Sequence, residues 1–311
     1  MEGEHKKEYN FHAKMNVHYI RTSDDLRLLC VEYSSKNKEL CVLFIHGMSG
    51  NFIENYFASV LGLWLSRSNL GFIYGHNRGY NHINDIATSE VEKEGGYKTK
   101  RIGAMYEIFD ECILDIDACL NKCIQLGYKK IILMGHSLGC NKVIYYLSKK
   151  KPSNVVGVVL TSPPDMVGLA KKPEYLPNYS ELYEEAKKNV DDGKPRRLLT
   201  SMIWDWYKLS SQTFLNLFTD GGLVDNLPVL RNPTKWKQLA SVNVPILGIM
   251  GEYDDIAIND LKEDLDLIES KATSCPSFTK KHIKKANHNY DSEEGDLAKV
   301  VLSWVKNEFE K

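Results

Sequence analysis

The chain has 311 residues and a formal net charge of −1 at pH 7, so it carries no global field that would attract nucleic acid or an anionic membrane surface. Apolar residues make up 43% and charged residues 26% of the chain, as in a globular protein. Its apolar runs fall short of the ~18–20 residues of a transmembrane helix, and its charged N-terminus predicts no secretory signal.

Strand-like and helix-like patterns alternate from the start of the chain. The first half predicts, in order, an antiparallel strand pair at 19–22 and 27–33, a buried strand at 41–45, a helix at 52–66, a strand at 71–74 and a helix at 105–126. The last of these places apolar residues at helical spacing before Gly127, a usual helix stop.

The same alternation continues in the second half. It predicts a strand at 130–134, a helix at 140–147, strands at 155–160, 245–250 and 277–284, and a closing amphipathic helix at 297–309. Strands that alternate with helices indicate an α/β fold with a mostly parallel central sheet and helices on both faces.

The alternation breaks at residues 163–242, which are helical in pattern and rich in aromatic residues. An insertion between two sheet strands predicts a helical cap over the carboxyl edge of the sheet, where such folds bind ligands. The expected domains are therefore a core of residues 1–162 and 243–311 and a cap of residues 163–242. The aromatic residues of the cap either face a substrate or form the cap's own small core.

A pentapeptide at residues 135–139, Gly-His-Ser-Leu-Gly, follows the strand predicted at 130–134 and precedes a helix. This strand–turn–helix context is that of a nucleophile elbow, in which small residues give a strained serine the room that it needs. We therefore expect Ser137 to be a nucleophile.

A serine hydroxyl requires a histidine base, which an acid usually orients. His288 follows the last predicted strand and Asp254 follows the strand before it, so both lie at the edge of the sheet where the elbow ends. Asp255 and Asp165 are alternatives for the acid, because each also follows a strand that ends at this edge.

An oxyanion hole should stabilise the charge that develops during attack. The backbone N–H of Leu138 is one expected donor, and that of Met48, in the turn after the strand at 41–45, is the other. The residues expected to contact substrate are His46, Gly47, His136, Trp204 and Trp206.

These motifs resemble the α/β-hydrolase superfamily: His46-Gly47, Arg78-Gly79, the elbow around Ser137, then Asp254 and His288. Residues 140–141 and 210–214 resemble a branch that includes esterases acting on siderophores. The loop at 75–80 departs from the superfamily pattern, because Asn81 replaces its final glycine. This departure predicts a different path for the loop, with His76 and His82 at the entrance of the site.

The resemblance implies a serine hydrolase with a lid that acts through an acyl-enzyme and needs no metal or organic cofactor. An ester with an apolar part is the expected substrate, and thioesters and amides use the same machinery. An acyltransferase and a non-catalytic binding protein with this fold are the alternatives, and the oligomeric state stays open. The seven cysteines lack a CxxC pair, which favours a reducing, cytoplasmic setting.

Overall fold

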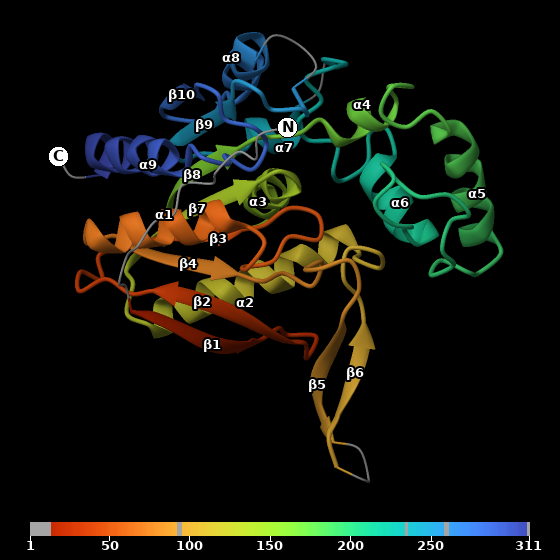
Figure 1. Cartoon of the computed structure of the whole chain (residues 1–311), viewed down its shortest axis with the longest axis horizontal. Coiled ribbons are helices and arrows are strands. Elements are labelled where there is room, and N and C mark those ends of the chain that lie inside the picture. Colours follow the sequence, from red (N-terminus) through yellow and green to blue (C-terminus); the bar gives the residue numbers. More distant parts are fainter. Residues whose placement is uncertain (1–13, 92–94, 234–235, 258–260, 310–311) are drawn as a thin grey trace, which may run out of the picture.

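The structure, a computed structural model, describes residues 14–91, 95–233, 236–257 and 261–309. Within these ranges the main sheet has the strand order β1-β2-β4-β3-β7-β8-β9-β10, and a second sheet pairs β5 with β6 (Figure 1). The strands are β1 Met15–Arg21, β2 Arg27–Tyr33, β3 Leu40–Ile45, β4 Gly71–Gly75, β5 Asp85–Val91, β6 Tyr97–Arg101, β7 Lys130–His136, β8 Val155–Thr161, β9 Ile246–Gly251 and β10 Phe278–Ile283.

The main sheet is mostly parallel, as predicted. β1 and β2 form the expected antiparallel pair, and β2 also runs antiparallel to β4. From β4 to β10 every neighbouring pair is parallel. Parallel strands bring their carboxyl ends to one edge, so the loops that follow β3, β7, β9 and β10 meet there.

Helices cover both faces of this sheet, as predicted (Figure 1). They are α1 Tyr56–Arg67, α2 Cys112–Gln125, α3 Leu138–Lys149, α7 Lys237–Ala240, α8 Leu261–Lys271 and α9 Glu294–Phe309. α1 and α9 pack on one face in a cluster that includes Phe57 and Val301. α2, α3 and α8 pack on the other face in a cluster that includes Ile116, Val143 and Leu265. None of the described helices has the length and apolar character needed to cross a bilayer.

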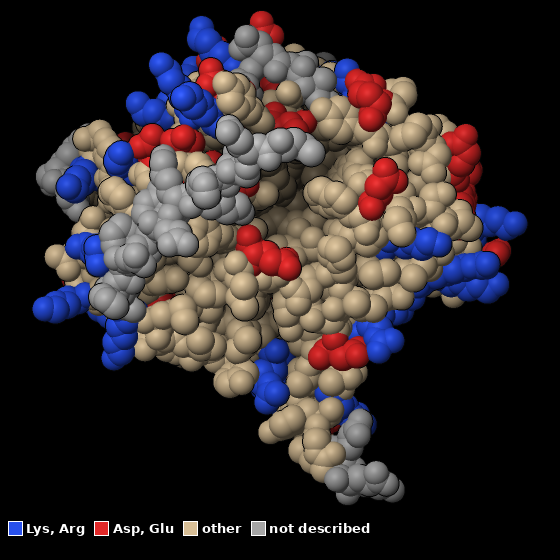
Figure 2. All heavy atoms as spheres, viewed as in Figure 1, with Lys and Arg blue, Asp and Glu red and all other residues tan. Residues whose placement is uncertain are grey.

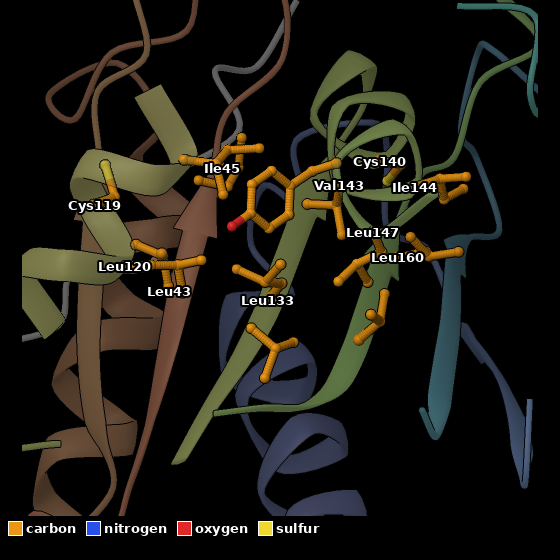
Figure 3. Packing of buried hydrophobic residues seen from close by; sticks show 14 of the residues in the cluster. Leu43, Ile45, Cys119, Leu120, Leu133, Cys140, Val143, Ile144, Leu147 and Leu160 are labelled. Carbon is orange, nitrogen blue, oxygen red and sulfur yellow. The ribbon is translucent and has the colours of Figure 1, made fainter. Parts of the chain in front are cut away.

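The helix that follows β7 is anchored on the sheet by its apolar face (Figure 3). Val143 and Leu147 of α3 belong to the same buried cluster as Leu133 of β7 and Leu160 of β8. Since a close-packed interior resists displacement, this packing fixes the N-terminus of α3 at the carboxyl edge of the sheet.

Between β8 and β9 the chain leaves the sheet and forms α4 Met166–Ala170, α5 Tyr179–Asp191 and α6 Ser211–Phe218 to one side of it (Figure 1). Their apolar side chains pack in a third cluster with Leu138 and Tyr145 of α3. The sequence pattern predicts that all of residues 163–242 belong to this cap. Within this segment, Leu227 and Leu239 belong to the core cluster of α3. The buried residues Leu227, Val229, Trp236, Leu239 and Val242 therefore pack with the core.

The structure also differs from the prediction around the hairpin and the second helix. The helix expected at 105–126 is shorter, because a 3₁₀ turn at Phe109–Glu111 precedes α2. Met105 instead binds the cap, accepting a hydrogen bond from the Ser210 N–H at 2.8 Å. The β5–β6 hairpin had no predicted counterpart, since β6 is exposed at every position and lacks the alternation that identifies a half-buried strand.

Candidate active site

Ser137 lies at the sharp turn between β7 and α3, with φ 54° and ψ −132°. A positive φ is costly for a residue with a side chain and marks strain that the surrounding fold must hold. Glycines leave the room for this turn. A Cβ on Gly135 would lie 2.5 Å from the Gly139 carbonyl oxygen, and one on Gly139 would overlap the Ile45 carbonyl oxygen. A strained serine between such glycines is the geometry of a nucleophile elbow.

Ser137 faces a cavity of about 430 Å³ between the core and the cap, seen as the hollow in Figure 2. The core contributes Met48, His136 and His288 to its wall. The cap contributes mainly apolar side chains, namely Met166, Leu169, Trp204 and Trp206. A concave site with a few polar groups and an apolar wall is typical of a small-molecule site.

His288 and Asp254 come from the loops after β10 and β9, which are adjacent parallel strands. Nδ1 of His288 lies 2.9 Å from Oδ1 of Asp254. A carboxylate only accepts hydrogen bonds, so it holds the proton on Nδ1 and leaves Nε2 as the basic nitrogen. His288 and Ser137 line the same cavity, so an imidazole and a serine hydroxyl face one site.

The environment of Asp254 favours its ionised form. Burial alone would raise the pKa of this carboxyl, but the hydrogen bond and charge of His288, followed by Ser162, bring the pKa below its ordinary value. The two alternative acids have other places. Asp165 caps α4 by accepting from the Gly168 N–H at 2.7 Å, and Asp255 is an exposed residue of the cavity wall.

His136 supports the loop that carries His288. Its Nε2–H donates to the His288 carbonyl oxygen at 2.8 Å, and the two rings lie 4.8 Å apart between centroids. Burial lowers the pKa of His136 to about 3. The ring is therefore neutral at physiological pH and adds no charge beside His288.

Two backbone N–H groups adjoin Ser137. Gly47 packs against the elbow so closely that a Cβ there would lie 2.8 Å from the Ser137 Cβ and 3.2 Å from the Leu138 nitrogen. Neither the Met48 N–H nor the Leu138 N–H donates a hydrogen bond to another described residue. Free donors beside a nucleophile are the components of an oxyanion hole.

His46 is the one expected substrate contact that the structure places elsewhere. Its ring is fully buried and lies behind the wall of the cavity. Nδ1–H donates to the Gly47 carbonyl oxygen at 2.9 Å, and Nε2 accepts from the Asn77 N–H at 3.1 Å. The sequence prediction was wrong on this point, because both ring nitrogens are hydrogen-bonded to backbone groups, those of Gly47 and Asn77. Gly47 itself lines the cavity, as expected.

His76 and His82 also lie away from the cavity wall. The ring of His76 stacks on Tyr80 at 4.8 Å, and burial lowers the pKa of His76 to about 4. The ring of His82 lies 4.3 Å from that of Tyr207 in the cap. The expectation that these histidines flank the entrance stays a prediction, because neither is among the residues that line the cavity.

Trp204 and Trp206 reach the cavity from a tight turn of the cap. The Trp206 N–H donates to the Ile203 carbonyl oxygen at 3.0 Å, and the central residues Trp204 and Asp205 have φ of 51° and 57°. Trp204 also packs edge-on against Phe218 at 5.6 Å. Trp204 therefore lines the cavity and also belongs to the cap's own packing.

Sequence reasoning missed several residues of the cavity wall. Glu54 lies in the turn that precedes α1, and Tyr175 lies in the cap. The Tyr175 hydroxyl donates to the Asp255 carbonyl oxygen at 2.9 Å, which ties the cap to the loop after β9. No local motif identifies such residues, because their positions depend on how the cap packs on the core.

Among the described residues, the group that could hold a metal ion consists of Asp254, Asp255 and His288, whose ligand atoms lie within 4.8 Å of one another. The His288–Asp254 hydrogen bond already uses Nδ1 and one carboxylate oxygen of this group. A metal ion bound to these atoms would compete with that hydrogen bond.

Known proteins resemble this chain in sequence family and in fold. Residues 106–306 match the family described as "Protein of unknown function (DUF1749)". No curated protein matches the chain.

Solved structures resemble the chain over nearly its whole length. The siderophore hydrolase EstB from Aspergillus fumigatus has a TM-score of 0.69 at 16% identity, over 97% of this chain and 99% of that one. Est1E from Butyrivibrio proteoclasticus, with ferulic acid bound, has a TM-score of 0.62 at 15% identity, over 94% and 100%. The carboxylesterase CesB from Bacillus subtilis has a TM-score of 0.53 at 15% identity, over 94% and 92%. The chain therefore has the α/β-hydrolase fold that the sequence predicted.

Proposed function

The chain belongs to the DUF1749 family, and we propose that it is a serine hydrolase that cleaves a carboxylic ester. One observation carries the proposal: the strained Ser137 shares a cavity with His288, whose Nδ1 is hydrogen-bonded to the buried Asp254. The structural neighbours described as a siderophore hydrolase, a carboxylesterase and Est1E with ferulic acid support ester chemistry on this fold.

In the first half of the proposed reaction, Oγ of Ser137 attacks the carbonyl carbon of the ester. Nε2 of His288 takes the hydroxyl proton, and Asp254 stabilises the imidazolium that forms. The N–H groups of Met48 and Leu138 bind the oxyanion of the tetrahedral intermediate. One such donor contributes about 10²–10³ in rate.

Collapse of that intermediate breaks the bond to the alcohol, which leaves with the proton that His288 returns. The acyl group stays on Ser137 as an ester. Water then attacks this acyl-enzyme, with His288 again as the base, and releases the carboxylic acid. An acyltransferase would differ only in using an alcohol or amine in place of water.

The wall of the cavity supports a substrate with an apolar part. Met166, Leu169, Trp204 and Trp206 give the cap side a mainly apolar surface beside Ser137. Burial of that surface against substrate contributes about 25 cal/mol per Å² of apolar area. Esters are preferred to amides in this proposal, because an alkoxide leaves more easily than an amine. Thioesters would use the same groups.

The cysteines support a reducing, cytoplasmic setting. Cys30 and Cys119 are both buried, and their sulfurs lie 3.6 Å apart in a hydrogen bond. Oxidising compartments favour disulfides between such neighbours.

A fluorophosphonate probe tests the proposal most simply, because it reacts with an activated serine. We expect rapid labelling of the wild-type protein and none of Ser137→Ala. The variant Ser270→Ala, at an exposed serine of α8 that does not line the cavity, should retain labelling. Absence of labelling in the wild type would favour a non-catalytic binding protein with this fold.

A further inference from the structure

Lys142 lies on α3 shortly after the Ser137 elbow, and its side chain is fully buried. Its Nζ lies 2.6 Å from Oε1 of Glu107 and 3.1 Å from Oδ1 of Asn77. Lysines are almost never fully buried unless they are paired, because desolvation of the charge is costly. The reaction steps described above do not use this ion pair, so its presence beneath the site requires another explanation.

Asn77 connects Lys142 to the loop that follows β3. Its side-chain Nδ2–H donates to the His46 carbonyl oxygen at 3.1 Å, and its backbone N–H donates to Nε2 of His46 at 3.1 Å. Its Oδ1 also accepts from the Gly79 N–H at 3.0 Å. Oδ1 of Asn77 must therefore face Lys142 and Gly79, and Nδ2 must face the His46 carbonyl oxygen. These hydrogen bonds give the side-chain amide a single orientation.

His46 carries the connection to the oxyanion hole. Its Nδ1–H donates to the Gly47 carbonyl oxygen at 2.9 Å. This carbonyl and the Met48 N–H belong to the same peptide unit, which is planar and trans, so the two groups point in opposite directions. A hydrogen bond that fixes the Gly47 oxygen therefore also fixes the direction of the Met48 N–H.

We propose that Lys142 is a positioning residue for the oxyanion hole and acts through Asn77 and His46 on the Gly47–Met48 peptide. The proposal rests on the serine hydrolase function proposed above. It explains why the lysine lies on α3: the same helix supplies the Leu138 N–H at its first turn. The helix α3 thus fixes the positions of both proposed oxyanion donors, the N–H groups of Met48 and Leu138, relative to Ser137.

The ion pair with Glu107 fixes the position of Nζ of Lys142. Hydrogen bonds that involve an ionised group are shorter and stronger than those between neutral groups. Glu107 holds Nζ from one side, and Asn77 accepts from Nζ on the other. Loss of Lys142 would leave Glu107 buried without its cation and would free Asn77 Oδ1 from one of its donors.

The test uses the double variant Lys142→Met/Glu107→Leu, since apolar residues of similar volume often replace a buried ion pair without loss of stability. The readouts are kcat and KM for a 4-nitrophenyl ester and the affinity for phenylboronic acid, which forms a tetrahedral adduct with a catalytic serine. We expect kcat and boronate affinity to fall together by about 10- to 100-fold, with KM within about threefold of wild type.

Two further variants complete the experiment. Asn77→Ala retains the Lys142–Glu107 pair but removes the side-chain amide that joins Lys142 to the His46 carbonyl oxygen, and it should lower kcat to the same extent even if the double variant fails to fold. Lys150→Met is the matched control, because Lys150 follows the same helix and pairs with Asp117 at 3.5 Å at the surface. Its kcat should equal that of wild type.

A folded double variant with wild-type kcat would overturn the positioning role while leaving the serine hydrolase proposal intact. An increase in KM at constant kcat would also overturn it, because that pattern reports lost ground-state binding. If the wild-type protein shows neither Ser137-dependent turnover nor boronate binding, the proposed function itself is wrong, and the positioning role is rejected with it.

Discussion

Nδ1 of His288 and Oδ1 of Asp254 lie 2.9 Å apart, although 34 positions separate the two residues in the chain. The loops that carry them follow adjacent parallel strands, β9 and β10. Their contact is thus a consequence of sheet topology, and it places an oriented imidazole beside the cavity that Ser137 faces.

The variant Asp254→Asn should lower kcat by about 10³- to 10⁴-fold, because an amide in place of the carboxylate no longer holds the Nδ1–H tautomer of His288. Asp255→Asn is the matched control, since Asp255 lines the same cavity but does not bind Nδ1 of His288. Steady-state kinetics on one ester should separate the two variants by at least about 10²-fold. Equal losses in both would contradict the assignment of Asp254.

Much of this architecture could be predicted because it depends on local signals. The buried strands at β7 and β8 are apolar runs, and the elbow is a motif with glycines on both sides of Ser137. The order of Ser137, Asp254 and His288 follows from where parallel strands end. Each of these inferences needs only the sequence of one element and the general rules of sheet topology.

The remaining features depend on tertiary packing. Nothing local distinguishes His46, whose ring turns into the protein, from a histidine that faces substrate. Likewise, Leu227 and Leu239 belong to the core cluster of α3, and Tyr175 reaches the cavity only because the cap folds over the core. Lys142 appears in sequence as an ordinary helix lysine, and only the fold shows that it is buried with Glu107.

Gly47→Ala should damage catalysis more than stability. The added Cβ would lie 2.8 Å from the Ser137 Cβ and 3.0 Å from the His136 carbonyl oxygen, so the loop after β3 must shift away from the elbow. A shift of about 1 Å costs about 10² in rate. Kinetics and thermal unfolding of the variant check this prediction, which fails if kcat is unchanged.

The stability of the protein should decrease on acidification below pH 6.5, in part because of His136. Burial lowers the pKa of His136 to about 3 in the folded state from an ordinary 6.5. Between these values the unfolded chain binds more protons, so each unit of pH removes up to about 1.4 kcal/mol from the free energy of unfolding. The contribution is fully present above pH 6.5 and is lost as the pH falls towards 3.

His136→Gln should make the pH dependence shallower by that amount, since glutamine does not titrate and can still donate to the His288 carbonyl oxygen. Urea unfolding of both proteins at pH 7, 6 and 5 measures the difference. Parallel curves for the variant and the wild type would show that His136 does not contribute.

The cavity should discriminate against anionic esters. Its wall includes the carboxylates of Glu54 and Asp255, and no lysine or arginine among the described residues lines it. We expect kcat/KM for 4-nitrophenyl hexanoate to exceed that for the anionic 4-nitrophenyl monoester of adipic acid by about tenfold or more at low salt. Glu54→Gln/Asp255→Asn should narrow this ratio, and an unchanged ratio in the double variant would assign the discrimination to another feature.

Hydrolysis of 4-nitrophenyl esters from acetate to decanoate, with Ser137→Ala and His288→Ala as controls, tests the central claim most directly. We predict turnover that falls by about 10⁴-fold or more in either variant, with a chain-length optimum that reflects the size of the cavity beneath the cap. Equal turnover in wild type and Ser137→Ala, or no turnover of any ester by a protein that also resists fluorophosphonate, would contradict the claim.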